Sequence, residues 1–194
     1  MSVRVDFYIL PDATDQGRLR LACKLAEKAY DNGHRVYVLA ADAAQAGVLD
    51  ELLWTFRQNS FVPHARYPVP ADETAPVWIS SDPPPQQADD VLINLTADLP
   101  PRFEQFQRIL ELVDQHPDVL AASRQRFRAY RAQGIEPASY QRYESENTKE
   151  PKATTKLGII ATATDHPDPV PDIVGVLQRY RVTHSSPDSR AALG

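Results

Sequence analysis

Short stretches typical of buried strands alternate with helical stretches along most of this chain. Residues 3–10 (VRVDFYIL) and 35–41 (RVYVLAA) are rich in β-branched and aromatic side chains, which favour strands. Between them, residues 18–32 place apolar side chains at helical spacing and end at Gly33, a residue that commonly stops a helix. This alternation predicts an α/β protein with three layers, in which helices cover both faces of a mostly parallel sheet.

The same criteria predict the other elements as far as residue 134. They are a helix capped by Asp42, strands at 77–80 and 91–96, a short helix at 100–106, a strand at 108–113 and a helix opened by Pro117. Prolines make much of residues 65–90 loop-like. For residues 101–113, a continuous helix is the alternative interpretation.

Composition narrows the class of protein. The chain has 194 residues, a formal net charge of −5 and a hydrophobic fraction of 42%, which is typical of a globular domain. We expect a cytoplasmic protein, because it has no membrane-spanning apolar run, no secretory signal pattern and a single cysteine, Cys23. The negative net charge argues against a protein whose own surface binds along many phosphate groups of a nucleic acid.

The character of the sequence changes near residue 142. Residues 143–194 are mostly polar and aperiodic, and their short apolar stretches at 157–161 and 173–182 are too small to build a second core. We therefore predict an ordered domain at residues 1–142 and a flexible C-terminal tail. A short helix is expected near residues 172–182.

A run of arginines marks the last predicted helix, between residues 119 and 134. Arg124, Phe127, Arg128 and Arg131 are spaced at i, i+3, i+4 and i+7, so they should share one helix face. Guanidinium groups beside an aromatic ring could hold a carboxylate through paired hydrogen bonds. Alternatively, cations near the end of a helix only complement its macrodipole.

Three aromatic residues lie within eight positions of one another. Trp54, Phe56 and Phe61 follow or end the helix that Asp42 caps. Such clustering usually fills a core. If exposed, it would be the aromatic anchor of a contact with another protein.

The sequence lacks the common local signals of catalysis and of metal binding. No histidine is spaced as a metal ligand, and a nucleophile elbow, a P-loop and a C-x-x-C pair are missing. The loop after the first strand lacks the glycine spacing that admits a pyrophosphate. Asp89 and Asp90 are expected to form a charged turn rather than a metal site, and Cys23 should lie in the core. These observations predict a binding protein without a cofactor, not an enzyme.

Several segments resemble the chi subunit of bacterial DNA polymerase III. They are DFY at 6–8, CKLAEKAYDNGHRVYV at 23–38, LDELLWTFRQNSFVPH at 49–64 and RFRAYRAQG at 126–134. The resemblance covers Val3 to about Tyr140, and LDE-x-LW with SFVPH is its most specific part. It implies a Rossmann-like sheet and a non-catalytic accessory of the clamp loader. Such a subunit pairs with the psi subunit and binds the acidic C-terminal tail of single-strand DNA-binding protein, so that it would contact DNA only indirectly.

The resemblance also implies roles for individual residues in binding that tail. Arg128, where the family often has lysine, would hold the terminal carboxylate, and Arg124 would be a second cation. Phe127 and Val113 would form the walls of a pocket for the terminal aromatic ring.

For the contact with psi, the resemblance implies a surface formed by Trp54, Phe61 and Pro63. Two other functions stay open at this point. One is direct binding of single-stranded nucleic acid, with the arginines on phosphates and Phe127 or Tyr130 stacked on bases. The other is a small-molecule enzyme on a Rossmann-like sheet.

Overall fold

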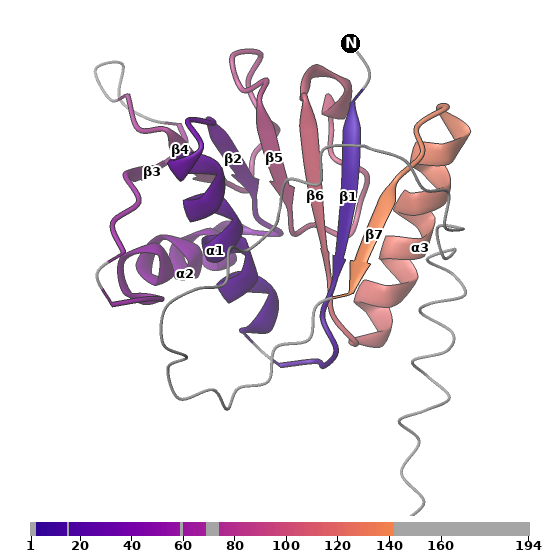
Figure 1. Cartoon of the computed structure of the whole chain (residues 1–194), viewed down its shortest axis with the longest axis horizontal. Coiled ribbons are helices and arrows are strands. Elements are labelled where there is room, and N and C mark those ends of the chain that lie inside the picture. Colours follow the sequence, from indigo (N-terminus) through magenta and orange to yellow (C-terminus); the bar gives the residue numbers. More distant parts are fainter. Residues whose placement is uncertain (1–2, 15, 59, 69–73, 142–194) are drawn as a thin grey trace, which may run out of the picture. The chain divides into compact units, whose positions relative to one another are not determined.

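A seven-stranded sheet forms the centre of the computed structural model, which describes residues 3–14, 16–58, 60–68 and 74–141 (Figure 1). The strand order is β3-β4-β2-β5-β6-β1-β7, and every neighbouring pair is parallel. The strands are β1 (Arg4–Ile9), β2 (Val36–Leu39), β3 (His64–Arg66), β4 (Val77–Ser80), β5 (Val91–Asn94), β6 (Arg108–Val113) and β7 (Ala138–Gln141). The helices are α1 (Gly17–Asp31), α2 (Ala43–Thr55), the single 3-10 turn η1 (Phe103–Gln105) and α3 (Pro117–Ala132).

The predicted α/β class is confirmed, and the sheet has two edge strands that the sequence did not predict. Strand β3 has three residues and follows Pro63, while β7 has the mostly polar sequence ASYQ. Neither stretch has the alternating apolar pattern by which a strand is recognised in a sequence. Each is a strand because a neighbour pairs with it, β4 for β3 and β1 for β7. Residues 108–113 form strand β6, so the alternative of a continuous helix was wrong.

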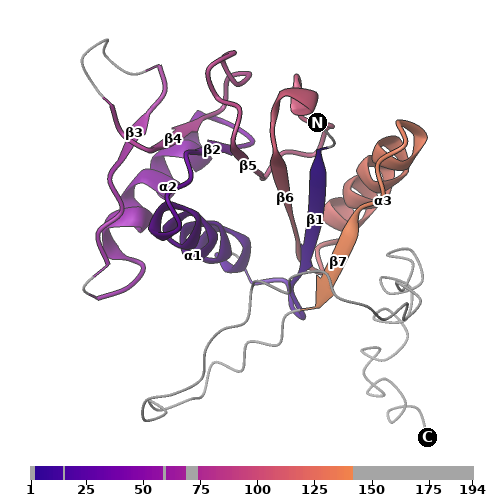
Figure 2. The same cartoon turned by 45° about the horizontal axis from the view of Figure 1, so that its top comes forward.

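The helices lie on opposite faces of the sheet, as the sequence predicts (Figure 2). Leu110 and Leu112 of β6 belong to the hydrophobic core beneath α1 and α2. Between them, the Glu111 side chain bonds to Arg126 of α3. Because successive side chains of a strand point to opposite faces, α3 covers the face that α1 and α2 leave open.

The ends of α3 follow from local sequence. Pro117 occupies the first turn, where its missing N–H costs no hydrogen bond, and Asp118 places negative charge near the positive end of the helix dipole. After the helix, Gly134 has a φ of +77°, a conformation that glycine adopts without strain. Both ends agree with the sequence prediction.

Helix α2 begins with a reciprocal cap. The carboxylate of Asp42 accepts a hydrogen bond from the Gln45 N–H at 2.7 Å, and the Gln45 side-chain oxygen accepts one from the Ala41 N–H at 2.9 Å. The two side chains therefore satisfy backbone donors that have no partner inside the helix.

Replacing Asp42 with alanine is expected to lower the free energy of unfolding by about 1 kcal/mol, within a range of about 0.5–2 kcal/mol for N-caps. Urea denaturation followed by circular dichroism measures this change. Glu51→Ala on the same helix is the control, because Glu51 is exposed and its removal should cost less than about 0.5 kcal/mol. Equal effects of the two substitutions would contradict the assignment of the cap.

The predicted tail at residues 143–194 and its helix near residues 172–182 lie outside the described residues. Among the helices that the structure describes, none is both long and apolar enough to cross a membrane.

Candidate functional site

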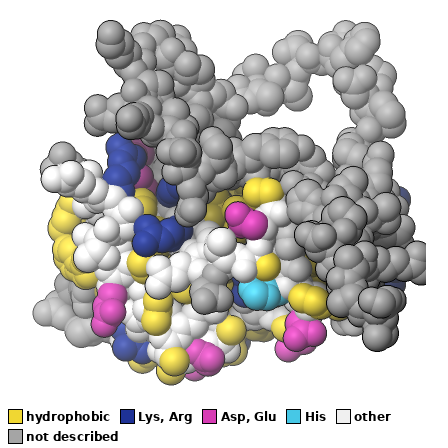
Figure 3. Space-filling view, turned by 90° about the horizontal axis from the view of Figure 1, so that it is seen from below, with side chains coloured by type: hydrophobic (Ala, Val, Ile, Leu, Met, Phe, Trp, Pro, Cys, Tyr) yellow, Lys and Arg dark blue, Asp and Glu magenta, His cyan; other side chains and the backbone are white. Residues whose placement is uncertain are grey.

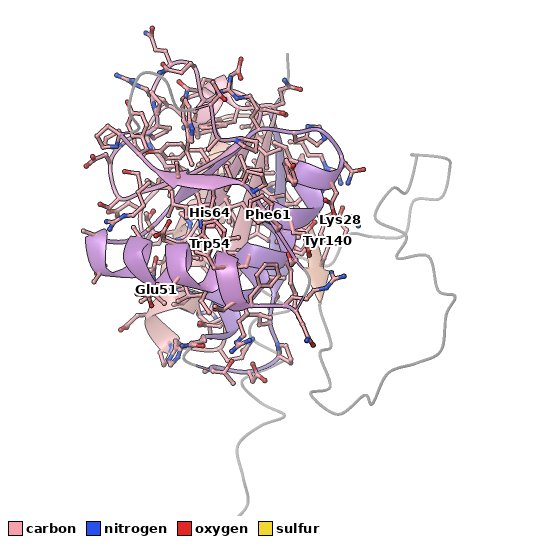
Figure 4. The ribbon with its side chains drawn as sticks, turned by 90° about the vertical axis from the view of Figure 1, so that its left-hand side faces the viewer. Lys28, Glu51, Trp54, Phe61, His64 and Tyr140 are labelled. Carbon is pink, nitrogen blue, oxygen red and sulfur yellow. The ribbon has the colours of Figure 1, made fainter. Side chains whose placement is uncertain are left out.

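Two aromatic rings lie exposed beside one another at the end of α2. Trp54 is 56% exposed and Phe61 is 65% exposed, and their ring centroids are 5.6 Å apart. Figure 4 shows both next to His64, the first residue of β3. We refer to Trp54 and Phe61 as the aromatic surface. Large rings open to solvent are typical of contacts between proteins.

Of the three clustered aromatic residues, one fills the core and two form an exposed surface, so each interpretation of the sequence holds for part of the cluster. Phe56 is partly buried against the hydrophobic core, as expected of core filling. Trp54 and Phe61 are exposed, and Pro63 is partly buried. Trp54 is exposed because it lies off the inward side of α2, which carries Leu49 and Leu53.

The segment that carries Phe61 is tied to α1 by one carboxylate. Glu27 accepts a hydrogen bond from the Ser60 hydroxyl at 2.6 Å and another from the Arg57 guanidinium at 3.1 Å. These bonds hold the chain on both sides of the turn after α2. The segment between Trp54 and Phe61 is thus tied to α1 at two residues.

The second candidate surface is the outer side of α3. Arg124 is partly buried and Arg128 is exposed, and within the described part of the chain neither has an ion-pair partner. The Nε atom of Arg124 is buried and forms no hydrogen bond to any described residue. Arg131 contacts the Glu136 carboxylate at 3.5 Å, and both side chains are well exposed. We call Arg124, Arg128 and Arg131 the cationic face of α3.

Phe127 does not lie open beside these cations, which corrects an expectation from the sequence. It is 6% exposed, and its ring packs edge-on against Phe7 at 5.4 Å. Helical residues are about 100° apart, so Phe127 and Arg128 point in clearly different directions. Phe127 therefore joins the inward stripe of Ser123, Arg126 and Tyr130.

Val113, the other residue expected to line a pocket, is 0% exposed at the end of β6. A side chain closed off in this way offers no free apolar surface. The premise of an open pocket between Val113 and Phe127 is therefore not met, whereas their roles in binding stay predictions.

A buried polar cluster beneath α3 was missed by the sequence analysis. The Glu111 carboxylate accepts hydrogen bonds from Arg126 Nε at 2.9 Å, from the Tyr130 hydroxyl at 2.8 Å and from the Asn94 amide at 3.1 Å. Burial and the nearby Glu111 carboxylate raise the pKa of Tyr130, so the phenol stays protonated and donates. The available signal was Glu111, a charge at an otherwise apolar position of the strand RILELV.

Asp90 and Cys23 have structural positions, and Cys23 lies in the core as expected. Asp90 accepts a hydrogen bond from the Arg35 N–H at 3.0 Å and contacts His34 Nδ1 at 3.1 Å, which ties together the starts of β2 and β5. Cys23 is buried, and burial raises the pKa of its thiol to about 12. No three potential metal ligands come together in the part of the chain described.

The carboxyl ends of the strands, where ligands bind in many open α/β sheets, face the viewer in Figure 3. The visible charged side chains there have both signs and lie scattered among hydrophobic ones. The described part of the chain is an all-parallel α/β domain with two candidate binding surfaces, the aromatic surface and the cationic face of α3.

Comparison with known proteins gives the family of this domain. The family described as DNA polymerase III chi subunit, HolC, matches residues 1–138. DNA polymerase III subunit chi of Pseudomonas aeruginosa is 45% identical over 131 residues, which are 68% of this chain and 91% of that protein. The subunit chi of Haemophilus influenzae is 30% identical over 140 residues, 69% of this chain and 94% of that protein. The subunit chi of Escherichia coli is 31% identical over 137 residues, which are 66% of this chain and 91% of that protein.

The chain therefore belongs to the DNA polymerase III chi subunit family, and the resemblance seen in its sequence is confirmed. The members of this family are subunits of DNA polymerase III, and the process that they serve is DNA replication.

Proposed function

We propose that this chain is a non-catalytic accessory subunit that links DNA polymerase III to single-strand DNA-binding protein. In this proposal the aromatic surface docks on the psi subunit of the clamp loader. The cationic face of α3 binds the acidic C-terminal tail of single-strand DNA-binding protein. The subunit would thereby hold the polymerase on template strands coated with that protein.

The exposed aromatic pair is the observation that carries the proposal. A tryptophan and a phenylalanine that are both more than half exposed leave apolar area in contact with water. Covering such rings is favourable, and buried aromatic residues are prominent among those that dominate binding energy between proteins. The bonds of Glu27 to Arg57 and Ser60 hold the segment before docking, so less conformational entropy is lost on binding.

The state of Arg124 supports the second contact. Its partly buried guanidinium has an unpaired Nε–H, and a carboxylate would supply the missing acceptor. Partial burial also reduces screening by water, which strengthens charge-assisted hydrogen bonds. Arg128, which is exposed, would add attraction for the acidic residues of the tail.

Replacing Arg124 or Arg128 with alanine is expected to weaken binding of a peptide that copies the acidic tail by about tenfold or more. This follows from about 1.5–3 kcal/mol for a hydrogen bond to a charged group. Calorimetric titration of the full chain measures the affinity, which should also fall as salt is added.

Arg20→Ala is the matched control for this prediction. Arg20 is exposed on α1, on the other side of the sheet, so its removal changes the net charge by the same amount. Its affinity for the peptide should equal that of the unchanged chain. Equal loss in all three variants would indicate attraction by overall charge and contradict a site on α3.

The function as a whole is tested by two binding experiments with the full chain. It should elute together with purified psi in gel filtration, and it should recover single-strand DNA-binding protein from a bacterial extract. Recovery should be lost when the last residues of that partner are removed. Tight binding of a bare oligonucleotide, with neither partner bound, would favour direct binding of single-stranded nucleic acid instead.

A further inference from the structure

Trp54 of the aromatic surface packs against a histidine whose two ring nitrogens both contact carbonyl oxygens. The His64 side chain is fully buried, and its ring centroid is 4.8 Å from that of Trp54. On its other side, Trp54 meets Phe61. The imidazole thus contacts Trp54 directly, and Trp54 in turn contacts Phe61 (Figure 4).

Both ring nitrogens of His64 face carbonyl oxygens. Nδ1 lies 2.6 Å from the backbone oxygen of Val62, and Nε2 lies 3.1 Å from that of Asp50. A carbonyl oxygen can only accept, and a neutral imidazole carries only one N–H. The ring can satisfy both carbonyls only when both nitrogens are protonated.

The charged group that the structure places against this ring suits the protonated form. The Asp50 carboxylate of α2 lies 3.5 Å from Nε2. The Trp54 ring, also from α2, is tilted by 53° from the imidazole, and the ring centroids are 4.8 Å apart. The other elements at the ring contribute Val62, through its carbonyl, and Val77 of β4, which pairs with the backbone of His64. Neither valine titrates.

We propose that His64 is a positioning residue for the aromatic surface and that its protonation strengthens docking of psi. The doubly protonated ring joins α2, through the Asp50 carbonyl, to the segment that carries Phe61, through the Val62 carbonyl. Loss of the proton frees one of these carbonyls and loosens the support of Trp54 and Phe61. This inference rests on the proposed docking of psi at the aromatic surface.

The sign of the pH dependence follows directly. The form of the surface in which His64 bonds to both carbonyls is the protonated one, so affinity for psi should fall as the pH rises. We expect a decrease of about tenfold.

Two matched variants separate His64 from the other titrating groups. His64→Gln removes the titrating ring and should give weaker, nearly pH-independent binding of psi to the full chain. His34→Gln removes an exposed histidine that contacts Asp90 and should keep the pH profile of the unchanged chain. An unaltered profile in His64→Gln would overturn the proposal.

A spectroscopic measurement decides the question even if His64→Gln fails to fold. Nitrogen NMR of the unchanged full chain reports whether each ring nitrogen carries a proton. At the pH where psi binds most tightly, both nitrogens of His64 should be protonated, and quenching of Trp54 fluorescence should fall with the same pH dependence as the affinity. A bare ring nitrogen at that pH would contradict the inference.

These measurements also separate the two proposals. If psi binds at no pH, the docking of psi is wrong, while the ring-nitrogen spectrum still decides the protonation of His64. If psi binds with a flat profile and Trp54 is needed for binding, the docking stands and the role of His64 fails.

Discussion

Replacing Arg126 with leucine is expected to lower the free energy of unfolding by about 3–5 kcal/mol, the range for breaking a buried ion pair. Arg126 is the cation of the buried cluster beneath α3, and its Nη1 also donates to the Ala97 carbonyl at 2.7 Å. Without it, the Glu111 carboxylate stays buried with only the Asn94 amide and the Tyr130 hydroxyl as donors. Urea denaturation of the full chain, followed by circular dichroism, measures the loss.

Two further variants make this test specific. Arg131→Leu removes an exposed arginine of the same helix whose contact with Glu136 should contribute less than about 1 kcal/mol. Combining Arg126→Leu with Glu111→Leu removes both charges, and the double variant should lose less stability than Arg126→Leu alone. Purely additive losses would show that the pair does not interact.

Trp54→Ala is expected to weaken binding of psi by about 30-fold or more, which corresponds to about 2 kcal/mol for a dominant interface residue. More than half of the Trp54 side chain is exposed, so its removal should affect binding much more than folding. Calorimetric titration with purified psi measures the affinity, and a thermal melt followed by circular dichroism checks the fold.

Tyr140→Ala is the matched control for the loss at Trp54. Tyr140 is also an exposed aromatic residue, at 41%, but it lies in β7, at the opposite edge of the sheet from β3. Its replacement should leave the affinity for psi unchanged. Equal losses at Trp54 and Tyr140 would place psi elsewhere than on the aromatic surface.

Much of the fold could be predicted because local sequence decides it. Apolar runs gave the central strands, Asp42 gave the start of α2, and Pro117 and Gly134 gave the two ends of α3. Each of these features acts within a few residues along the chain. The edge strands β3 and β7 were missed because pairing with a distant strand, and not their own pattern, makes them extended.

The candidate sites, too, could be predicted only in part from the sequence. The presence of aromatic residues after α2 and of arginines in α3 was evident from the sequence. Their exposure was not, since Phe127 belongs to the stripe that packs on Phe7, while Trp54 points away from the core. A difference of one position in a helix turns a side chain by about 100°, which is enough to exchange burial for exposure.

The sequence by itself therefore determined an alternating α/β chain, its helix ends and its family. Only the tertiary structure decided that Glu111 bonds to Arg126, that Trp54 and Phe61 are open to solvent, and that the His64 ring lies against Trp54. These contacts join residues from separate elements, and their geometry depends on how the sheet and helices pack together.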